Sequence, residues 1–150
     1  MGSILSIGVD KRIMTEQLPQ LYNHEAEQIL LWKLTVFPYE LTDISQRITA
    51  DSFHMPANKV VWEAMQRLNA QGKPWQDLVL LWEETKAKIG DYVLGLESGG
   101  DGSVSHYADL VASYATRRAL VDMSSKVATA AYDIDNDVQN VVALANEQVA

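Results

Sequence analysis

Residues 98–132 read SGGDGSVSHYADLVASYATRRALVDMSSKVATAAY, and this stretch decides the fold. Three glycines lie within residues 99–102, which is typical of a flexible connection between two structural units. Residues 104–132 are rich in alanine and contain neither proline nor glycine, so they predict one unbroken helix, about 43 Å long at 1.5 Å per residue. The stretch therefore predicts a glycine hinge at residues 99–103 and a long helix after it.

A break and a second apolar stripe follow the long helix. Ile134 interrupts the helical pattern, and either Asp135 or Asn136 is suited to cap a last helix. That helix carries small apolar residues at helical spacing, namely Val138, Val141, Val142, Ala145 and Val149. A long helix, a tight break and another helix predict an αα-hairpin over residues 104–150, with its second arm cut short at Ala150.

A hairpin of two helices on a hinge cannot bury an apolar face by itself. We therefore expect its surface to contact the body of the domain or another copy of the chain. The candidate self-association and docking residues, with tyrosines as anchors and arginines at the rim, are Tyr107, Val111, Tyr114, Arg117, Arg118, Val121, Val138 and Val142. For each of them, packing within the chain is an equal alternative. Truncation at Ser103 is expected to leave a folded body that associates less.

The first 98 residues predict a lead and a set of short helices. Residues 1–22 lack a hydrophobic period and predict a mobile lead. Capping and breaking residues then delimit helices that begin after Asn23, near Leu41, at Pro56 and after Asp77. The sequence therefore predicts an all-α fold, in which a small globular helical bundle over residues 23–98 precedes a protruding αα-hairpin.

Tryptophan and histidine side chains are candidates for binding surfaces. Trp62 and Trp82 lie among apolar neighbours and are predicted to be core residues, whereas Trp32 and Trp75 are candidates for a docking face. The histidines stand in separate segments without a partner at ligand spacing. We expect surface or helix-end positions for His24, His54 and His106.

Composition excludes several classes of function. The formal net charge is −8, and an acidic chain gains little from neutralising phosphates, so we expect no direct DNA binding. The chain has no cysteine, hence neither a disulfide nor a thiolate metal site, which suits the cytoplasm. No apolar run approaches the roughly 20 residues of a membrane helix, so no membrane association is expected.

Three short patterns resemble catalytic or binding motifs, and each is incomplete. The stretch HEAEQ at residues 24–28 lacks the second histidine of a zinc-protease helix. A calcium loop starting at Asp133 would need glycine and glutamate where Val138 and Leu144 stand. Residues 99–102 lack the Gly-Lys-Ser/Thr end of a phosphate loop. We therefore predict no catalytic, cofactor-binding or metal-binding residues.

Several landmarks occur in a characteristic order. They are Glu25–Gln28, Ser52-Phe53 with Pro56-Ala57, Val60–Met65, Gly72-x-Pro74, Tyr107–Val111 and Arg117–Leu120. In this order and spacing, residues 18–149 resemble the N-terminal domain of DnaB-type replicative DNA helicases. Each motif is weak by itself, and the specificity lies in their order.

The resemblance implies a non-catalytic, all-helical domain whose hairpins pair between neighbouring subunits and help to organise a hexameric ring as dimers. It also implies docking of the primase, or of a helicase loader in some systems. The expected partners are therefore a second copy of the chain and one of these proteins. ATP and magnesium are expected only in a motor domain that lies C-terminal to this one, after a linker.

Departures from the family pattern imply a divergent member, of phage or prophage type. Trp32 and Lys33 stand where the family usually has a Gly-Gly pair, so the helices must pack differently there. Asn58 replaces the histidine of Pro-Ala-His, and Gln76 replaces an aspartate. The family's Gly-Gly-x-x-Tyr-Leu segment is shortened to residues 90–94.

Two other functions stay open. A stand-alone phage or prophage adaptor or inhibitor would bind a host helicase or primase, and a gene that ends near Ala150 would favour it. A small helical enzyme is the third alternative, although the sequence places no pair of titratable residues convincingly for catalysis.

Overall fold

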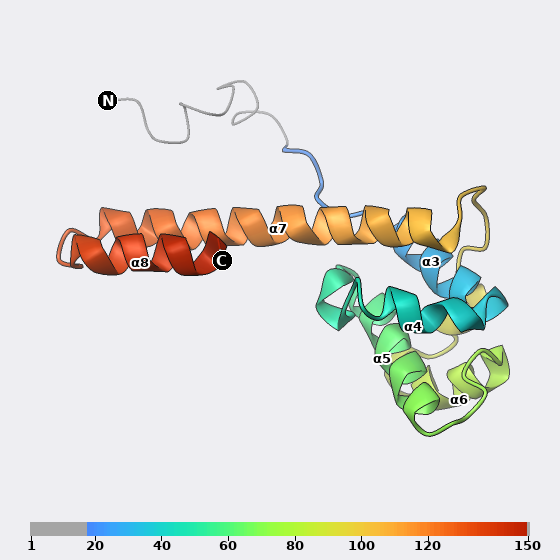
Figure 1. The fold of residues 1–150 in the computed structure, drawn as a ribbon. Coiled ribbons are helices and arrows are strands. Elements are labelled where there is room, and N and C mark those ends of the chain that lie inside the picture. The colour runs from blue at the N-terminus through green and yellow to red at the C-terminus, as the bar shows by residue number, and fades with distance from the viewer. Residues whose placement is uncertain (1–17, 150) are drawn as a thin grey trace.

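The computed structural model describes residues 18–149, which form helices and no strands. In chain order the elements are α3 (His24–Val36), η1 (Pro38–Glu40), α4 (Leu41–Ile44), η2 (Ala50–Ser52), α5 (Pro56–Ala70), α6 (Leu78–Ile89), η3 (Tyr92–Gly95), α7 (Val104–Tyr132) and α8 (Val138–Val149). Figure 1 shows α3 to α6 gathered below one end of α7, while α8 runs back along its other half. The predicted all-α fold, a globular bundle followed by a protruding αα-hairpin, is confirmed.

Local signals set most helix ends as predicted. The Asn23 side chain accepts a hydrogen bond of 2.9 Å from a first-turn amide of α3, which ends before Pro38. Pro56 occupies the first turn of α5, where no amide hydrogen is needed. Asp77 accepts a hydrogen bond of 2.9 Å from a first-turn amide of α6. Gly90 ends that helix with a φ of 61°, a conformation that glycine adopts without strain.

Two helix ends differ from the predicted ones. The helix that begins at Leu41 ends at Ile44, and Ile48 is buried in the turn that leads to η2. The cap of α8 is Asp137, whose side chain accepts from a first-turn amide at 2.9 Å, and neither Asp135 nor Asn136. The earlier residues are held in the preceding turn, where both of their backbone amides donate to Asp133.

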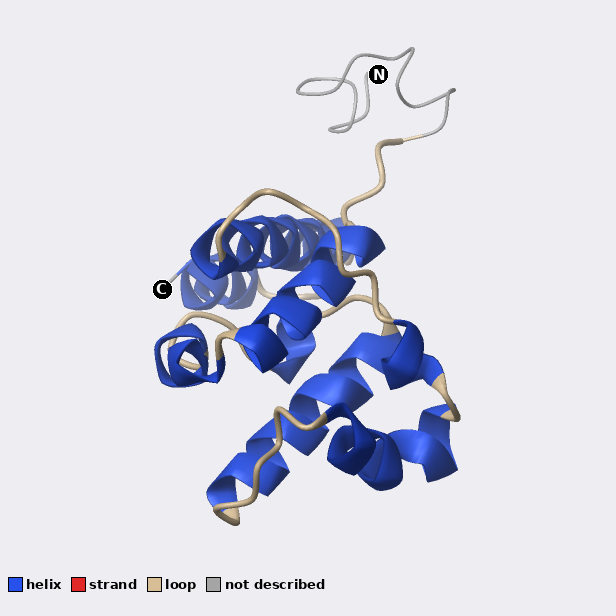
Figure 2. Cartoon of the chain, turned by 90° about the vertical axis from the view of Figure 1, so that its right-hand side faces the viewer, coloured by secondary structure: helices blue, strands red, loops and turns tan. Residues whose placement is uncertain are grey.

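The hydrophobic core lies among α3, α5, α6 and the first half of α7. Figure 2 shows these helices crossing one another at the end of α7 that carries the body. The α5 stripe is buried as predicted at Val61, Ala64, Met65 and Leu68, while Val60 is half-buried.

The tryptophans distribute differently from the prediction. Trp62 is a core residue as expected, but Trp75 is also buried, whereas Trp82 is half-buried. The indole N–H of Trp82 donates to Asp91 at 2.8 Å, and Lys86 lies over the ring at 4.5 Å. Trp82 therefore packs against the core while its indole N–H and ring also meet polar partners.

The packed core extends past the hinge predicted at residues 99–103 and into the first turns of α7. Four residues of the first turns of α7 belong to the core: Val104, Tyr107, Ala108 and Val111. The reason is that α3 covers this face of α7, so the inner half of the helix completes the body. The glycine segment is mostly exposed, but Gly100 lies so close to the Tyr107 ring that an added Cβ atom would clash with it.

The residues just before α3, which belong to the predicted mobile lead, contact the rest of the chain. Leu21 and Tyr22 are half-buried, and the Leu21 carbonyl accepts a hydrogen bond from Arg118 of α7 at 2.8 Å. Residues 18–20 have no regular secondary structure. The rest of the predicted lead, residues 1–17, lies outside the described residues.

Candidate functional site

The eight candidate association residues divide between the two halves of the hairpin. In the inner half, Tyr107 is 9% exposed and Val111 is 3% exposed, because both pack against the globular body. Arg118 donates to the Leu21 and Ser52 carbonyl oxygens at 2.8 and 2.9 Å. These three residues thus make contacts within the chain, and their predicted role in association stays a prediction.

Tyr114 and Arg117 line a surface hollow of about 310 Å³ between α7 and residues 19–21. Arg117 is exposed and Tyr114 is half-buried. The apolar residues that line this hollow are Pro19, Leu21 and Leu110. Tyr114 and Arg117 therefore both reach solvent beside this hollow.

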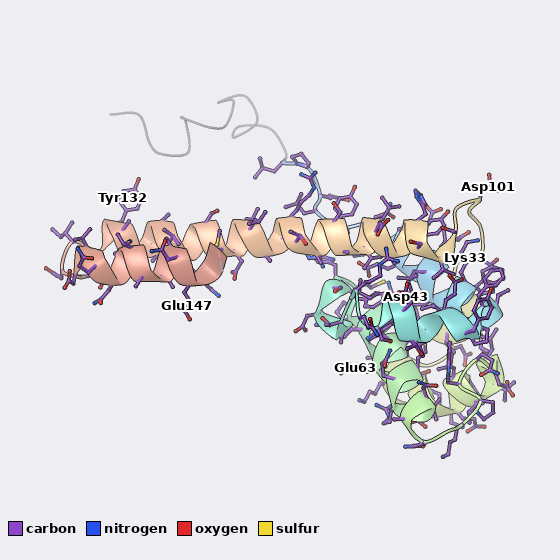
Figure 3. All side chains as sticks on the ribbon, viewed as in Figure 1. Lys33, Asp43, Glu63, Asp101, Tyr132 and Glu147 are labelled. Atoms are coloured by element: carbon purple, nitrogen blue, oxygen red, sulfur yellow. The ribbon has the colours of Figure 1, made fainter. Side chains whose placement is uncertain are left out.

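The outer half of the hairpin keeps several large apolar side chains in solvent. Its exposed members, here called the outer hairpin surface, are Leu120, Val121, Tyr132, Ile134, Val138 and Val142. Figure 3 shows Tyr132 projecting from the far end of α7, away from α8. Val121, Val138 and Val142 are predicted candidates, and the sequence reasoning missed the other three. Apolar side chains beside a hairpin turn are the signal that points to Tyr132 and Ile134, since such turns are usually polar.

Contacts of Arg47 and Lys33 hold the start of α7 on the body. Arg47, which follows α4, donates to the Ser105 hydroxyl at 2.9 Å and forms an ion pair with Asp109 of α7. Lys33 of α3 lies over the Tyr107 ring, 5.8 Å from its centroid. Thus Lys33, at the position where the family usually has glycine, contacts α7 through its side chain.

Glu27 is a buried carboxylate at the junction of α3 and α5. Its two oxygens accept hydrogen bonds from the backbone amides of His54 and Met55 at 2.9 and 3.2 Å, and from the Asn58 side chain at 3.0 Å. Asn58 in turn accepts from the Tyr92 hydroxyl at 2.6 Å. Burial, followed by the nearby Glu27 charge, raises the pKa of Tyr92, so its hydroxyl stays a donor.

The hydrogen bonds around Glu27 and Asn58 have a structural role. Every polar atom of Glu27 and Asn58 that is buried has a hydrogen-bond partner among the described residues. In residues 18–149, no three histidine, cysteine or acidic side chains are grouped so that they would hold a metal ion. The sequence reasoning placed Glu27 in the first turn of α3 and missed its partners, because these lie 27 to 31 residues away.

Two histidines that the sequence places far apart meet beside this network. His24 Nε2 and His54 Nδ1 are 2.8 Å apart, and the Tyr22 ring stacks on both imidazoles. His106 lies elsewhere, in the first turn of α7.

The helices of residues 18–149 do not include one that is both long and apolar enough to span a membrane.

Comparison with known proteins fits this architecture. Residues 19–132 match the family described as DnaB-like helicase N terminal domain. The chain is 34% identical over 117 residues to the replicative DNA helicase DnaB of Pasteurella multocida, covering 72% of this chain and 25% of that protein. It is 22% identical over 145 residues to the replicative DNA helicase DnaC of Bacillus subtilis, covering 91% of this chain and 32% of that one.

A solved structure shares the fold. The N-terminal domain of the DnaB helicase from Mycobacterium tuberculosis superposes with a TM-score of 0.75 at 23% identity, covering 87% of this chain and 99% of that one. This chain spans about a quarter to a third of the length of the two helicases named above. The matched residues include the whole globular body and α7, and on this evidence the chain belongs to the DnaB-like helicase N-terminal domain family.

Proposed function

We propose that this chain is the non-catalytic assembly domain of a replicative DNA helicase, and that its outer hairpin surface pairs with the same surface of a second copy. The observation that carries this proposal is the contrast between the two halves of α7. The inner half is covered by α3, whereas the apolar residues of the outer half remain in solvent. Removing such a surface from water contributes about 25 cal/mol per Å² and favours association.

Light scattering on the purified chain tests the pairing. At high micromolar concentration we expect a dimer or a larger assembly, and a monomer would contradict the proposal. The double variant Val121→Gln/Val142→Gln should shift the equilibrium toward monomer, because it replaces two exposed apolar side chains of the surface. Val79→Gln is the matched control, since Val79 is 62% exposed but belongs to α6 of the body.

Docking of a primase or a helicase loader is the second part of the proposal, and it rests on family membership. Arg117 and Tyr114, beside the hollow on α7, are the residues that we expect to contact this partner. Calorimetric titration with the purified primase of the same genome tests the docking. We expect Arg117→Ala to weaken binding and Lys73→Ala, in the exposed turn after α5, to leave it unchanged. Equal binding by both variants would remove Arg117 from the interface.

The motor activity of the whole protein is tested by the native gene. A linker and then Gly-x-x-x-x-Gly-Lys-Ser/Thr after codon 150 would supply the expected ATP and magnesium site outside this chain. A stop codon would favour the stand-alone adaptor or inhibitor of a host helicase or primase.

A further inference from the structure

Three aromatic rings from separate segments form one stack on the surface of the body. Tyr22 precedes α3, His24 is the first residue of α3, and His54 lies between η2 and α5. The Tyr22 ring is 4.2 Å from each imidazole, with interplanar angles of 24° to His24 and 8° to His54. The two imidazoles are joined by the 2.8 Å hydrogen bond between Nε2 and Nδ1.

The same stack is tied to the hairpin. Arg118 of α7 donates to the carbonyl oxygen of Leu21, which directly precedes Tyr22, and to that of Ser52, two residues before His54. One guanidinium therefore holds both backbone segments that carry the stack. Its hydrogen bonds go to neutral carbonyls, which leave its positive charge beside the imidazoles.

Protonation acts directly on this arrangement. The bond between His24 and His54 needs one nitrogen that donates and one that accepts, so at least one imidazole must be neutral. When both are protonated, both nitrogens are donors and two positive charges lie close to a third, on Arg118. The carboxylate that faces them is Glu27, whose oxygens already accept from two amides and Asn58.

We propose that Tyr22, His24 and His54 form a proton-sensitive junction that holds residues 21–23 and the Arg118 side of α7 on the body while the histidines are neutral, and that releases them when both are protonated. The ionisable groups facing His54 are His24 and Glu27 of α3, Tyr22 before α3, and Arg118 of α7. Close to His54 in the sequence, Asp51 and Lys59 form an ion pair with each other, with 3.3 Å between Oδ1 and Nζ.

The charges predict the direction of the pH dependence. Desolvation by its neighbours, then Arg118 and His24, lower the pKa of His54 below its ordinary value of 6.5, and Glu27 opposes them. The closed junction thus binds fewer protons than the open one. Its stability is fully present above the ordinary histidine pKa and is lost as the pH falls through the lowered pKa of His54.

Amide hydrogen exchange on the whole chain tests the junction. The reporter amides are those of Ala26, His54 and Met55, whose acceptors are the Asn23 and Glu27 side chains. Between about pH 8 and pH 5 we expect their protection, corrected for intrinsic exchange, to fall by roughly ten-fold relative to the α5 core amides. In His54→Gln, which cannot gain a proton, the reporter protection should change little, and His106→Gln should behave as the wild type.

Two results would overturn the proposal. One is an equal loss of protection at acid pH in His54→Gln and in the wild type. The other is measured on the wild type alone, so it stands even if the variant fails to fold. If the imidazole proton resonances of His54 titrate while the reporter amides keep their protection, the junction does not respond to protonation.

Discussion

At the scale of single residues, Glu27 is the most consequential side chain of the body. The residue is 2% exposed, and its carboxylate accepts from three donors, of which the Asn58 side chain is buried and the His54 and Met55 amides are partly buried. In Glu27→Ala the loss of these acceptors is expected to lower the free energy of unfolding by about 3 kcal/mol or more. Urea unfolding measures it. Glu63→Ala, at an exposed position of α5, is the control and should stay within about 0.5 kcal/mol of the wild type.

Gly100 is the glycine whose substitution is predicted to matter. Its φ of 92° strains any other residue, and an added Cβ would clash with the Tyr107 ring that packs over it. Gly100→Ala should therefore destabilise the chain by about 1–3 kcal/mol. Gly95→Ala is the matched control, because no heavy atom lies within 4 Å of its added Cβ. Equal melting temperatures for the two variants would show that residues 99–102 are a loose connection, as the sequence alone suggests.

At the scale of elements, α7 serves two parts of the molecule. Its first turns complete the core with α3, and its last turns pair with α8. Two arginines hold the inner half on the body: Arg47 of the body pairs with Asp109 of α7, and Arg118 of α7 donates to the Ser52 carbonyl of the body. The helix is therefore both a wall of the body and the arm that carries the outer hairpin surface.

Truncation within α7 separates these two roles. A chain that stops at Ser103 loses Val104, Tyr107, Ala108 and Val111 from the core and should fail to fold, in contrast to the expectation from the sequence. A chain that stops at Ala119 keeps these residues and Arg118, so it should remain helical and monomeric. Circular dichroism reports the folding, and light scattering reports the association. A cooperative thermal transition in the shorter chain would contradict this prediction.

At the scale of the whole molecule, an acidic chain carries exposed apolar side chains on the outer half of its hairpin. Two copies with a formal net charge of −8 each repel one another, and salt screens this repulsion while leaving apolar burial favourable. If the outer hairpin surface drives pairing, the dimer should be tighter at about 0.5 M than at 0.05 M NaCl. Sedimentation equilibrium at both salt concentrations measures the dissociation constant. Weaker association at high salt would indicate an interface held by ion pairs.

The helices themselves follow from the sequence. Asn23, Pro56, Asp77 and Gly90 act on backbone groups within one turn, so their effect is readable from neighbouring residues alone. The unbroken α7 follows in the same way from residues 104–132. The landmarks quoted above also led correctly to the family.

Tertiary structure decided what each helix face covers. The sequence marks Tyr107 and Val111 as candidates for a contact, but it does not distinguish α3 of the same chain from another copy as the partner. The partners of Glu27, the pairing of His24 with His54 and the two carbonyls held by Arg118 lie 27 to 97 residues apart. Such contacts depend on how the chain closes upon itself, and no local pattern of residues encodes that closure.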